Sequence, residues 1–250
     1  MCYDDGARPP LPPIAGAAAE HGDLVLTAAD GNRLGAYAAR AAEPTGAGIV
    51  VMPDVRGLHR FYKELAQRFA EAGVDAVAID YFGRTAGVGS REDGFDYQPH
   101  VRKTTPDGVT TDVAAGVAHL RSAQGGAARA VFTVGFCFGG GNSWRQAAGG
   151  HGLAGAIGFY GSPDLALDVL DRLAAALLVL VAGDDRARPA SAFEDFDRRL
   201  TAAGVPHEQK VYEGAPHSFF DRTAEQHKDA SADAWRRMLG FISARTPAST

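Results

Sequence analysis

A glycine-rich turn between a strand and a helix constrains this chain more than any other feature. The apolar run 130–134 predicts a buried strand, and residues 142–148 predict the start of a helix. Between them stands Gly135-Phe136-Cys137-Phe138-Gly139. A strand, a Gly-x-nucleophile-x-Gly turn and a helix are the layout of a nucleophile elbow, whose glycines avoid collisions of side chains with the strand and helix. Cysteine at the centre predicts nucleophilic catalysis by a thiolate.

Other interpretations of this turn are weaker. A phosphate-binding loop has Lys followed by Ser or Thr after its glycines, and that pair is absent here. The Gly-x-Gly-x-x-Gly spacing of a dinucleotide site is also absent. A single buried cysteine is otherwise usually a small core residue, which is the competing interpretation of Cys137.

Two later loops supply the acid and the base that such a nucleophile needs. The apolar run 177–182 ends in Gly183-Asp184-Asp185, just beyond the carboxyl end of a predicted strand. A further strand predicted over 208–213 leads into the loop that carries His217. Nucleophile, acid and histidine is the chain order of the α/β-hydrolases.

The choice between the adjacent acids is less direct, because only one can point at the histidine. We interpret His217 as the base and Asp185 as the acid that orients it. Asp184 is expected to bind backbone amides of its own loop. An ordinary loop histidine is the alternative interpretation of His217.

The whole chain of 250 residues fits one domain, since no linker, charge block or internal repeat divides it. We expect an extended N-terminal tail over 1–22 and a single domain over 23–245, without a separate lid domain. The net charge of −5 and the interspersed signs argue against a nucleic-acid partner and against a polybasic membrane-binding segment.

The cysteines and histidines narrow the chemistry further. Cys2 lies before a proline-rich stretch, so a structural disulfide with Cys137 is not expected. The N-terminal residues lack the pattern of a signal peptide and no segment has transmembrane length, which favours a cytoplasmic protein. The remaining histidines show no spacing typical of a metal site.

Hydrophobic periodicity predicts the order of the elements. Strands are expected over 23–27, 33–39, 48–52, 74–79, 130–134, 154–160, 177–182 and 208–213, and helices over 61–72, 109–121, 165–174, 190–203 and 224–243. The first two strands flank Asp30-Gly31-Asn32 and predict an antiparallel hairpin. The others alternate with helices, which predicts an α/β fold with a mostly parallel sheet covered on both faces. Residues 83–106 are expected to form a long loop over the site.

From about Asp23 to Phe241 the chain resembles the dienelactone hydrolase family, cysteine members of the α/β-hydrolase fold. Five blocks carry the resemblance: Pro53–Gly57, Asp80–Arg84, Gly135–Gly140, Gly183–Asp185 with Pro189 four residues later, and Ala215–Phe219. The resemblance implies Cys137 as nucleophile, His217 as base and Asp185 as acid, with no cofactor or metal. It also implies an oxyanion hole made by the backbone N–H groups of Val55 and Phe138.

Two positions depart from the family pattern. Where the family often has a glutamate that interacts with the resting thiol, this chain has Asp54, whose side chain is one methylene shorter. The resemblance implies the same role for Asp54, and a loop-capping carboxylate is the alternative interpretation. The family also holds a substrate carboxylate with two arginines. Arg84 matches the first, with a solvated or loop-pinning arginine as its alternative, whereas the second position falls at Asp221, with Arg222 one residue further on.

These residues predict a cysteine hydrolase that cleaves an activated ester or an enol-lactone of the dienelactone type through a thioester. Tyr160, at the end of a strand, is expected to line the substrate pocket, with packing against the core as the alternative interpretation. The broken arginine pair favours a general esterase or thioesterase for neutral acyl groups as the alternative. A non-catalytic ligand receptor or a redox-sensing thiol protein on the same scaffold is a further alternative. The expected partner is a small-molecule ester or lactone, and the expected state is a monomer or a dimer.

Overall fold

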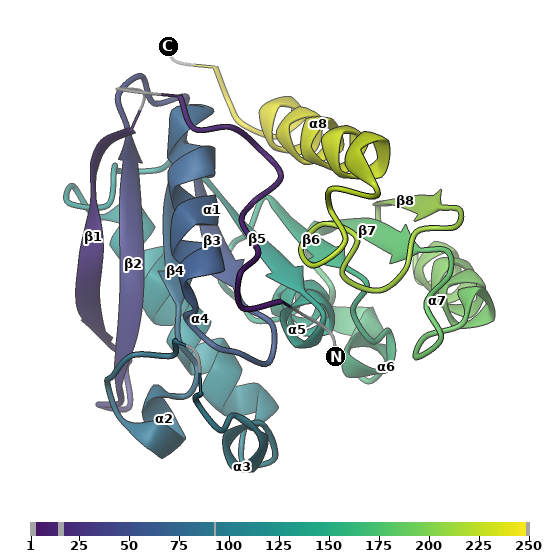
Figure 1. Ribbon diagram of the computed structural model, residues 1–250, viewed down its shortest axis with the longest axis horizontal. Helices are drawn as coiled ribbons and strands as arrows, with labels where there is room; N and C mark the ends of the chain where they lie inside the picture. Colours follow the sequence, from purple (N-terminus) through teal and green to yellow (C-terminus); the bar gives the residue numbers. More distant parts are fainter. Residues whose placement is uncertain (1–3, 15–17, 93, 249–250) are drawn as a thin grey trace.

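The computed structural model describes residues 4–14, 18–92 and 94–248, and an eight-stranded sheet organises them (Figure 1). The strands lie in the order β1-β2-β4-β3-β5-β6-β7-β8. They are β1 (Ala18–Thr27), β2 (Arg33–Ala41), β3 (Ala47–Met52), β4 (Val74–Ile79), β5 (Ala130–Phe136), β6 (Gly155–Phe159), β7 (Ala176–Ala182) and β8 (His207–Tyr212). The β1–β2 and β2–β4 pairs are antiparallel and the other pairs are parallel, as expected for an α/β-hydrolase fold.

Helices cover both faces of this sheet (Figure 1). They are α1 (Arg60–Glu71), α2 (Gly83–Ala86), α3 (Gln98–Val101), α4 (Pro106–Arg121), α5 (Phe138–Gln146), α6 (Asp164–Leu167), the 3-10 helix η1 (Leu170–Arg172), α7 (Ala190–Ala202) and α8 (Lys228–Ala244). The helices α1 and α8 pack on one face, and α4, α5 and α7 pack on the other. Within the described ranges, no helix is long and apolar enough to cross a membrane.

Strand β3 shows why its sequence is a continuous apolar run. Ile49 and Val51 join the core beneath α1, whereas Val50 and Met52 join the core beneath α4. Successive side chains of a strand point to opposite faces, so a strand that is covered on both faces must be apolar at every position. The carboxyl end of β3, at Met52, pairs with Gly135 of β5, next to the predicted turn at Cys137.

Three segments differ from the sequence-based expectation. The predicted loop 83–106 contains the short helices α2 and α3, and the last helix begins at Lys228 instead of residue 224. The predicted helix 165–174 is broken into α6 and η1. Arg145 of α5 donates to the Leu165 carbonyl at 2.9 Å and binds Asp168, so side-chain contacts take the place of a continuous helical ladder there.

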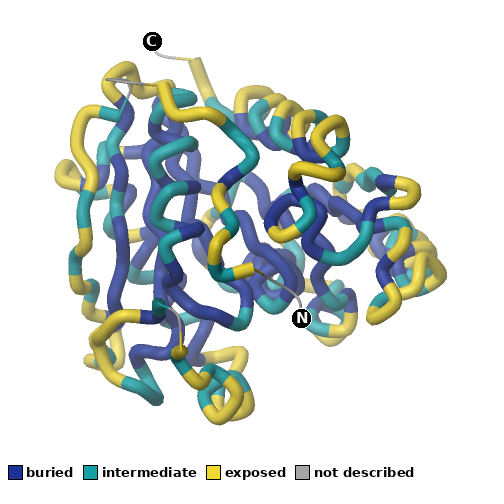
Figure 2. Tube along the Cα trace, viewed as in Figure 1, coloured by how far each residue is buried: buried dark blue, intermediate teal, exposed yellow. Residues whose placement is uncertain are grey.

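Residues 4–11 pack on the protein, although the proline-rich sequence predicts an extended tail there. Strand β1 begins at Ala18, before the expected start at residue 23. Residues 4–11, which we call the N-terminal strap, run beside α1 towards the end of the sheet where α5 begins (Figure 1). In Figure 2 the strap alternates between exposed and covered positions, and Pro9 is buried. Cys2 lies outside the described residues.

Trp144 of α5 provides a test of how the elbow helix is held on the sheet. Its side chain is fully buried, and its indole Nε1 donates to the Leu178 carbonyl of β7 at 3.2 Å. We expect Trp144→Phe to lower the free energy of unfolding by about 1–3 kcal/mol, because a buried carbonyl loses its donor. Urea unfolding followed by circular dichroism measures this loss. The matched change at the half-buried Trp235 is expected to cost less, and an equal cost would contradict the role of this hydrogen bond.

Candidate active site

The turn at Cys137 has the strained geometry of a nucleophile elbow. Cys137 joins β5 to α5 with φ 53° and ψ −111°, a conformation rare for a residue with a side chain, and it is 5% exposed. A Cβ at Gly135 would overlap the carbonyl oxygen of Gly139, and one at Gly139 would overlap that of Met52. The turn can therefore form only with glycine at both positions, which is the steric reason expected from the sequence.

Asp185 and His217 come together beyond the carboxyl ends of β7 and β8. The Asp185 Oδ2 lies 2.6 Å from the His217 Nδ1, and the Ala187 backbone N–H donates to Oδ1 at 2.9 Å. Burial alone would raise the pKa of Asp185, but its hydrogen bond with His217 and nearby positive charge hold that pKa below its usual value. The ionised carboxylate accepts the Nδ1 proton, which leaves Nε2 as the basic nitrogen.

Backbone strain concentrates around these residues. Among the described residues, the non-glycine positions with positive φ are Ala127, Cys137, Tyr160 and Ser218, so three of the four stand in or next to the candidate site. Tyr160 follows β6, and its ring centre lies 4.7 Å from that of His217. Burial raises the pKa of the Tyr160 hydroxyl well above its usual value, so the hydroxyl stays neutral. Strain of this kind is typical of functional sites.

A hollow of about 530 Å³ opens beside the histidine. It is lined by Asp184, Asp185, Arg186, Ala187, Pro216, His217 and Arg222. Arg222 therefore faces the same hollow as the candidate base. A larger hollow of about 730 Å³ between β8 and the start of α8 contains none of the three candidate residues, so the chemistry and not the size of a hollow identifies the site.

Arg188 is a neighbour of the site that the sequence did not single out. Its Nη1 lies 3.3 Å from the His217 Nδ1 and 4.0 Å from the Asp185 Oδ2. The only signal in the sequence is a cation three residues after Asp185, a spacing too common to interpret alone. Its charge helps to keep Asp185 ionised.

The two expected oxyanion donors share one edge of the sheet. Val55 follows β3 and Phe138 is the first residue of α5, and β3 pairs with β5 up to Met52 opposite Gly135. The Phe138 amide stands at the positive end of the α5 dipole. The Val55 N–H therefore belongs to the loop after β3, and the Phe138 N–H belongs to the first turn of α5, directly after Cys137.

Arg84 is bound to the body of the protein. Its Nη2 lies 2.8 Å from the Asp112 Oδ1 on α4, and its Nη1 lies 2.5 Å from the Asp30 Oδ2 in the β1–β2 turn. Its Nε also donates to the Gly108 carbonyl. These contacts tie Arg84 to α4 and to the hairpin, as a loop-pinning arginine would be.

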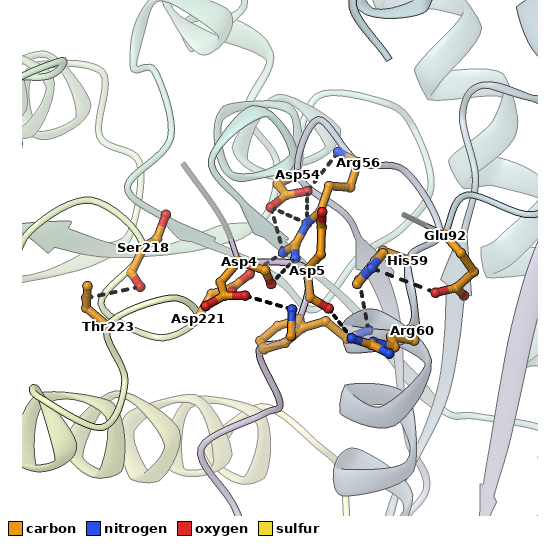
Figure 3. Close-up of polar contacts among 12 residues, drawn as sticks. Asp4, Asp5, Asp54, Arg56, His59, Arg60, Glu92, Ser218, Asp221 and Thr223 are labelled. Carbon is orange, nitrogen blue, oxygen red and sulfur yellow. Dashed lines mark hydrogen bonds and ion pairs between the residues drawn. The ribbon is translucent and has the colours of Figure 1, made fainter. Parts of the chain in front are cut away.

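Asp54 and Asp221 share the buried guanidinium of Arg56 (Figure 3). The Arg56 Nη2 lies 2.9 Å from the Asp54 Oδ2, and the same Nη2 binds the Asp221 Oδ2. The Arg56 backbone N–H also donates to the Asp54 Oδ1 at 2.9 Å. Arg56 belongs to the block Pro53–Gly57, but the sequence alone predicts no role for it, because its partner Asp221 lies 165 residues away.

The Asp221 carboxyl is expected to make stability depend on pH. Burial raises its pKa from 3.8 to about 7, so between these values the folded state binds a proton that the unfolded chain does not. The free energy of unfolding should therefore rise as the pH falls from 7 towards 5, by at most about 1.4 kcal/mol per pH unit. Asp221→Asn should lack this contribution. Urea midpoints of both proteins across this range measure the difference, and parallel pH curves would contradict the assignment.

Among the residues that the structure describes, no three His, Cys, Asp or Glu side chains are grouped to hold a metal ion.

Comparison with known proteins assigns the chain to a family. The profile of the "Dienelactone hydrolase family" matches residues 34–245. A Yersinia pestis protein named provisionally as a carboxymethylenebutenolidase is 29% identical over 224 residues, which cover 85% of this chain and 84% of that protein. A likewise named protein of Escherichia coli K12 is 27% identical, with 95% and 94% of the two chains covered.

Solved structures agree with this assignment. A crystal structure from Klebsiella pneumoniae, provisionally titled a dienelactone hydrolase, has a TM-score of 0.75 and 26% identity, with 90% of this chain and 99% of that chain covered. The dienelactone hydrolase-like promiscuous phosphotriesterase P91, from metagenomic libraries, has a TM-score of 0.77, covers 91% and 99% of the chains and, at 22% identity, shows the shared fold. The chain therefore belongs to the dienelactone hydrolase family and is a hydrolase of ester or lactone bonds.

Proposed function

We propose that this protein is a cysteine hydrolase that cleaves an activated ester or enol-lactone through Cys137, His217 and Asp185. The observation that carries the proposal is the 2.6 Å contact between Asp185 and His217 at the same end of the sheet as the strained Cys137 elbow. Acyl transfer needs a histidine oriented by an acid and a nucleophile held in a strained turn. A ligand receptor needs neither of these features.

The reaction would proceed in two halves. His217 Nε2 accepts the Cys137 thiol proton, and the thiolate forms a bond to the substrate carbonyl carbon. The backbone N–H groups of Val55 and Phe138 stabilise the oxyanion, which collapses to a thioester as the C–O bond to the leaving group breaks. Once the leaving group has departed, it takes the proton from His217, so that the Nε2 atom is free to accept a proton from water. The resulting hydroxide attacks the thioester, the C–S bond breaks, and the acid leaves as His217 returns the proton to the Cys137 thiolate.

The leaving group explains why a thiolate suits this reaction. An enolate or a phenolate departs without first being protonated, whereas an amine has to be protonated to leave. We therefore expect enol-lactones and aryl esters to be cleaved and amides to be poor substrates.

The contacts of Arg84, and the aspartate that stands where a second arginine was expected, favour a second candidate. This candidate is an esterase or thioesterase for uncharged acyl groups. Arg84 is bound by Asp30 and Asp112, and the position expected for a second arginine is Asp221, which binds Arg56. Neither contact favours a clamp for a substrate carboxylate. Hydrolysis rates of a carboxylate-bearing dienelactone and of its methyl ester, under the same conditions, distinguish the candidates. A preference for the acid supports the dienelactone substrate, and a preference for the methyl ester supports the second candidate.

The thioester itself is tested by rapid acid quenching. Intact-protein mass spectrometry, taken within the first turnover of an aryl ester, should show one acyl group, and peptide mapping should place it on Cys137. The adduct should disappear on treatment with hydroxylamine, as a thioester does. Turnover without an adduct on Cys137, at a quench time shorter than one turnover, would contradict the mechanism.

A further inference from the structure

Strand β8 ends the sheet on one side, where it pairs with β7 and with no other described strand (Figure 1). Two hydrogen bonds fix the direction of its peptide groups. The Leu177 N–H donates to the Pro206 carbonyl, and the Gly183 N–H donates to the Tyr212 carbonyl, both at 2.9 Å. The backbone groups of successive residues in a strand point to opposite sides. The backbone groups of the even-numbered residues of β8 therefore face β7, and those of the odd-numbered residues face outwards.

Three residues of β8 present their backbone N–H and C=O groups at this outer edge. They are His207, Gln209 and Val211. Within the part of the chain that the structure describes, these backbone groups make no hydrogen bond. An open strand edge of this kind is a template for pairing with a further strand.

A second copy of β8 fits this edge in one antiparallel register. The register places Gln209 of one copy opposite Gln209 of the other, on a two-fold axis, and His207 opposite Val211. In each facing pair the two residues exchange both N–H···O=C bonds. Between these pairs, Glu208 of each copy lies directly opposite Lys210 of the other. These are non-hydrogen-bonded pairs, in which side chains are closer, so the opposite charges attract at both places related by the axis.

The same charges disfavour the neighbouring registers. The smallest shift that keeps the outward backbone groups of both strands facing each other moves one strand by two residues. In one direction this shift sets Glu208 opposite Glu208, and in the other direction it sets Lys210 opposite Lys210. Like charges directly opposite each other destabilise a strand pair. The charge pattern of β8 therefore selects the register centred on Gln209.

The contacts of these side chains leave them available to a facing strand. The Gln209 Oε1 atom is buried and has no hydrogen-bond partner among the described residues. The amide of a second Gln209 across the axis supplies a donor for it. Lys210 is half-buried, and its Nζ lies 5.6 Å from the ring centre of Tyr212. Glu208 binds Arg245, with 3.2 Å between Oε1 and Nη2, but its side chain is 54% exposed and can bind a second cation.

Open space borders β8 on the side where the charged pairs would form. The Tyr212 hydroxyl donates to the Asp233 Oδ2 of α8 at 3.0 Å, so the even-numbered side chains of β8 lie on the α8 side of the sheet. The hollow of about 730 Å³ lies on this side, and Lys210, Tyr212, Asp233 and Arg237 are among the residues that line it. The side chains of a facing strand therefore have room beside Lys210.

The opposite edge of the sheet, β1, lacks this pattern. It carries Glu20 and Asp23 but no lysine or arginine, so a two-fold contact along β1 would bring acidic side chains together without a basic partner. Its pairing with β2 is irregular between Ala18 and Glu20. Irregularities of this kind turn an edge away from further pairing.

We propose that this protein forms a symmetric dimer through β8, in which the two sheets join into one continuous sheet. The partner is a second copy of this chain, bound edge to edge along His207–Val211 in the register centred on Gln209. The contact is a single short strand, so we expect a dissociation constant in the micromolar range. This inference concerns the β8 edge and does not depend on the proposed hydrolase function.

Sedimentation velocity of the full chain across the micromolar range measures this dissociation constant. Gln209→Pro removes an outward N–H, a change that an edge strand tolerates, and should raise the dissociation constant by at least about tenfold. Glu208→Lys alone and Lys210→Glu alone set like charges opposite each other at both places related by the axis, and each should raise the constant likewise. Glu43→Lys, at an exposed site after β2, is the matched control with an unchanged constant.

An equimolar mixture of the two charge variants is the sharpest test. In a mixed dimer of Glu208→Lys with Lys210→Glu the facing charges are again opposite at both places. The mixture should therefore dimerise about as tightly as the original protein, although each variant alone does not. This test needs no proline, so it also decides the question if Gln209→Pro does not fold.

Three results would overturn the proposal. The first is an original protein that stays monomeric throughout the micromolar range. The second is a dimer whose dissociation constant none of these β8 variants changes, because such a dimer forms through another surface. The third is a mixture that associates no better than its two components alone.

Discussion

Replacement of Cys137 by alanine is expected to lower kcat for an activated ester by at least about 10⁴-fold. Losses of this size are typical when the nucleophile of a catalytic triad is removed, because the remaining groups supply only binding and oxyanion stabilisation. Burst and steady-state kinetics with an aryl ester measure the loss. Alanine removes only the sulfur atom from this buried turn, so the fold should be retained.

The chain offers its own control for this prediction. Cys2→Ala removes the other cysteine of the sequence and should leave kcat unchanged. Alkylation by iodoacetamide should inactivate the Cys2→Ala protein, in parallel with modification of Cys137. A Cys137→Ala protein with more than about a tenth of the original kcat would rule out this nucleophile.

Replacement of Asp185 by asparagine should have the second largest effect. Asparagine keeps the shape of the side chain but can donate to the His217 Nδ1, which favours the wrong tautomer of the imidazole. In a well-studied triad this change lowers kcat by about 10⁴-fold, and we expect a loss of about 10³- to 10⁴-fold here. The measurement is kcat as a function of pH, since a structural defect alone would not change the pH profile.

Asp184 provides the matched comparison, because it is the adjacent residue and bears the same group. Its backbone N–H donates to the Ala215 carbonyl at 2.9 Å, a contact that Asp184→Asn leaves intact. We expect kcat of Asp184→Asn to stay within about threefold of the unmodified protein. Equal losses in the two variants would mean that the orienting acid is not Asp185.

The parts of this protein that the sequence predicted are those set by local chemistry. The elbow depends on glycines within two residues of Cys137, and the sheet depends on apolar periodicity within each strand. Both can be recognised from short stretches of sequence. The order of candidate nucleophile, acid and histidine could be proposed because each residue stands in the loop that follows a predicted strand, and their catalytic roles stay predictions.

The parts that the sequence could not predict depend on contacts between distant residues. Whether Arg84 faces a substrate or the protein depends on Asp30 and Asp112, which no local pattern connects to it. The pairing of Arg56 with Asp221 spans 165 residues. The strap has the composition of a frayed tail, and only the burial of Pro9 and the acceptors offered to Arg56 and Arg60 show that it is docked.

The position of the strap has a practical consequence for preparing this protein. In Figure 1 the N-terminal end of the described chain lies near α5, in the middle of the view, whereas the C-terminal end lies at the top, beyond α8. An affinity tag fused ahead of Asp4 would be attached near the candidate active site, where it would compete with a substrate or pull the strap away. A tag on the C-terminal end avoids both effects, so kinetic work should use a C-terminal tag or a tag that is cleaved off.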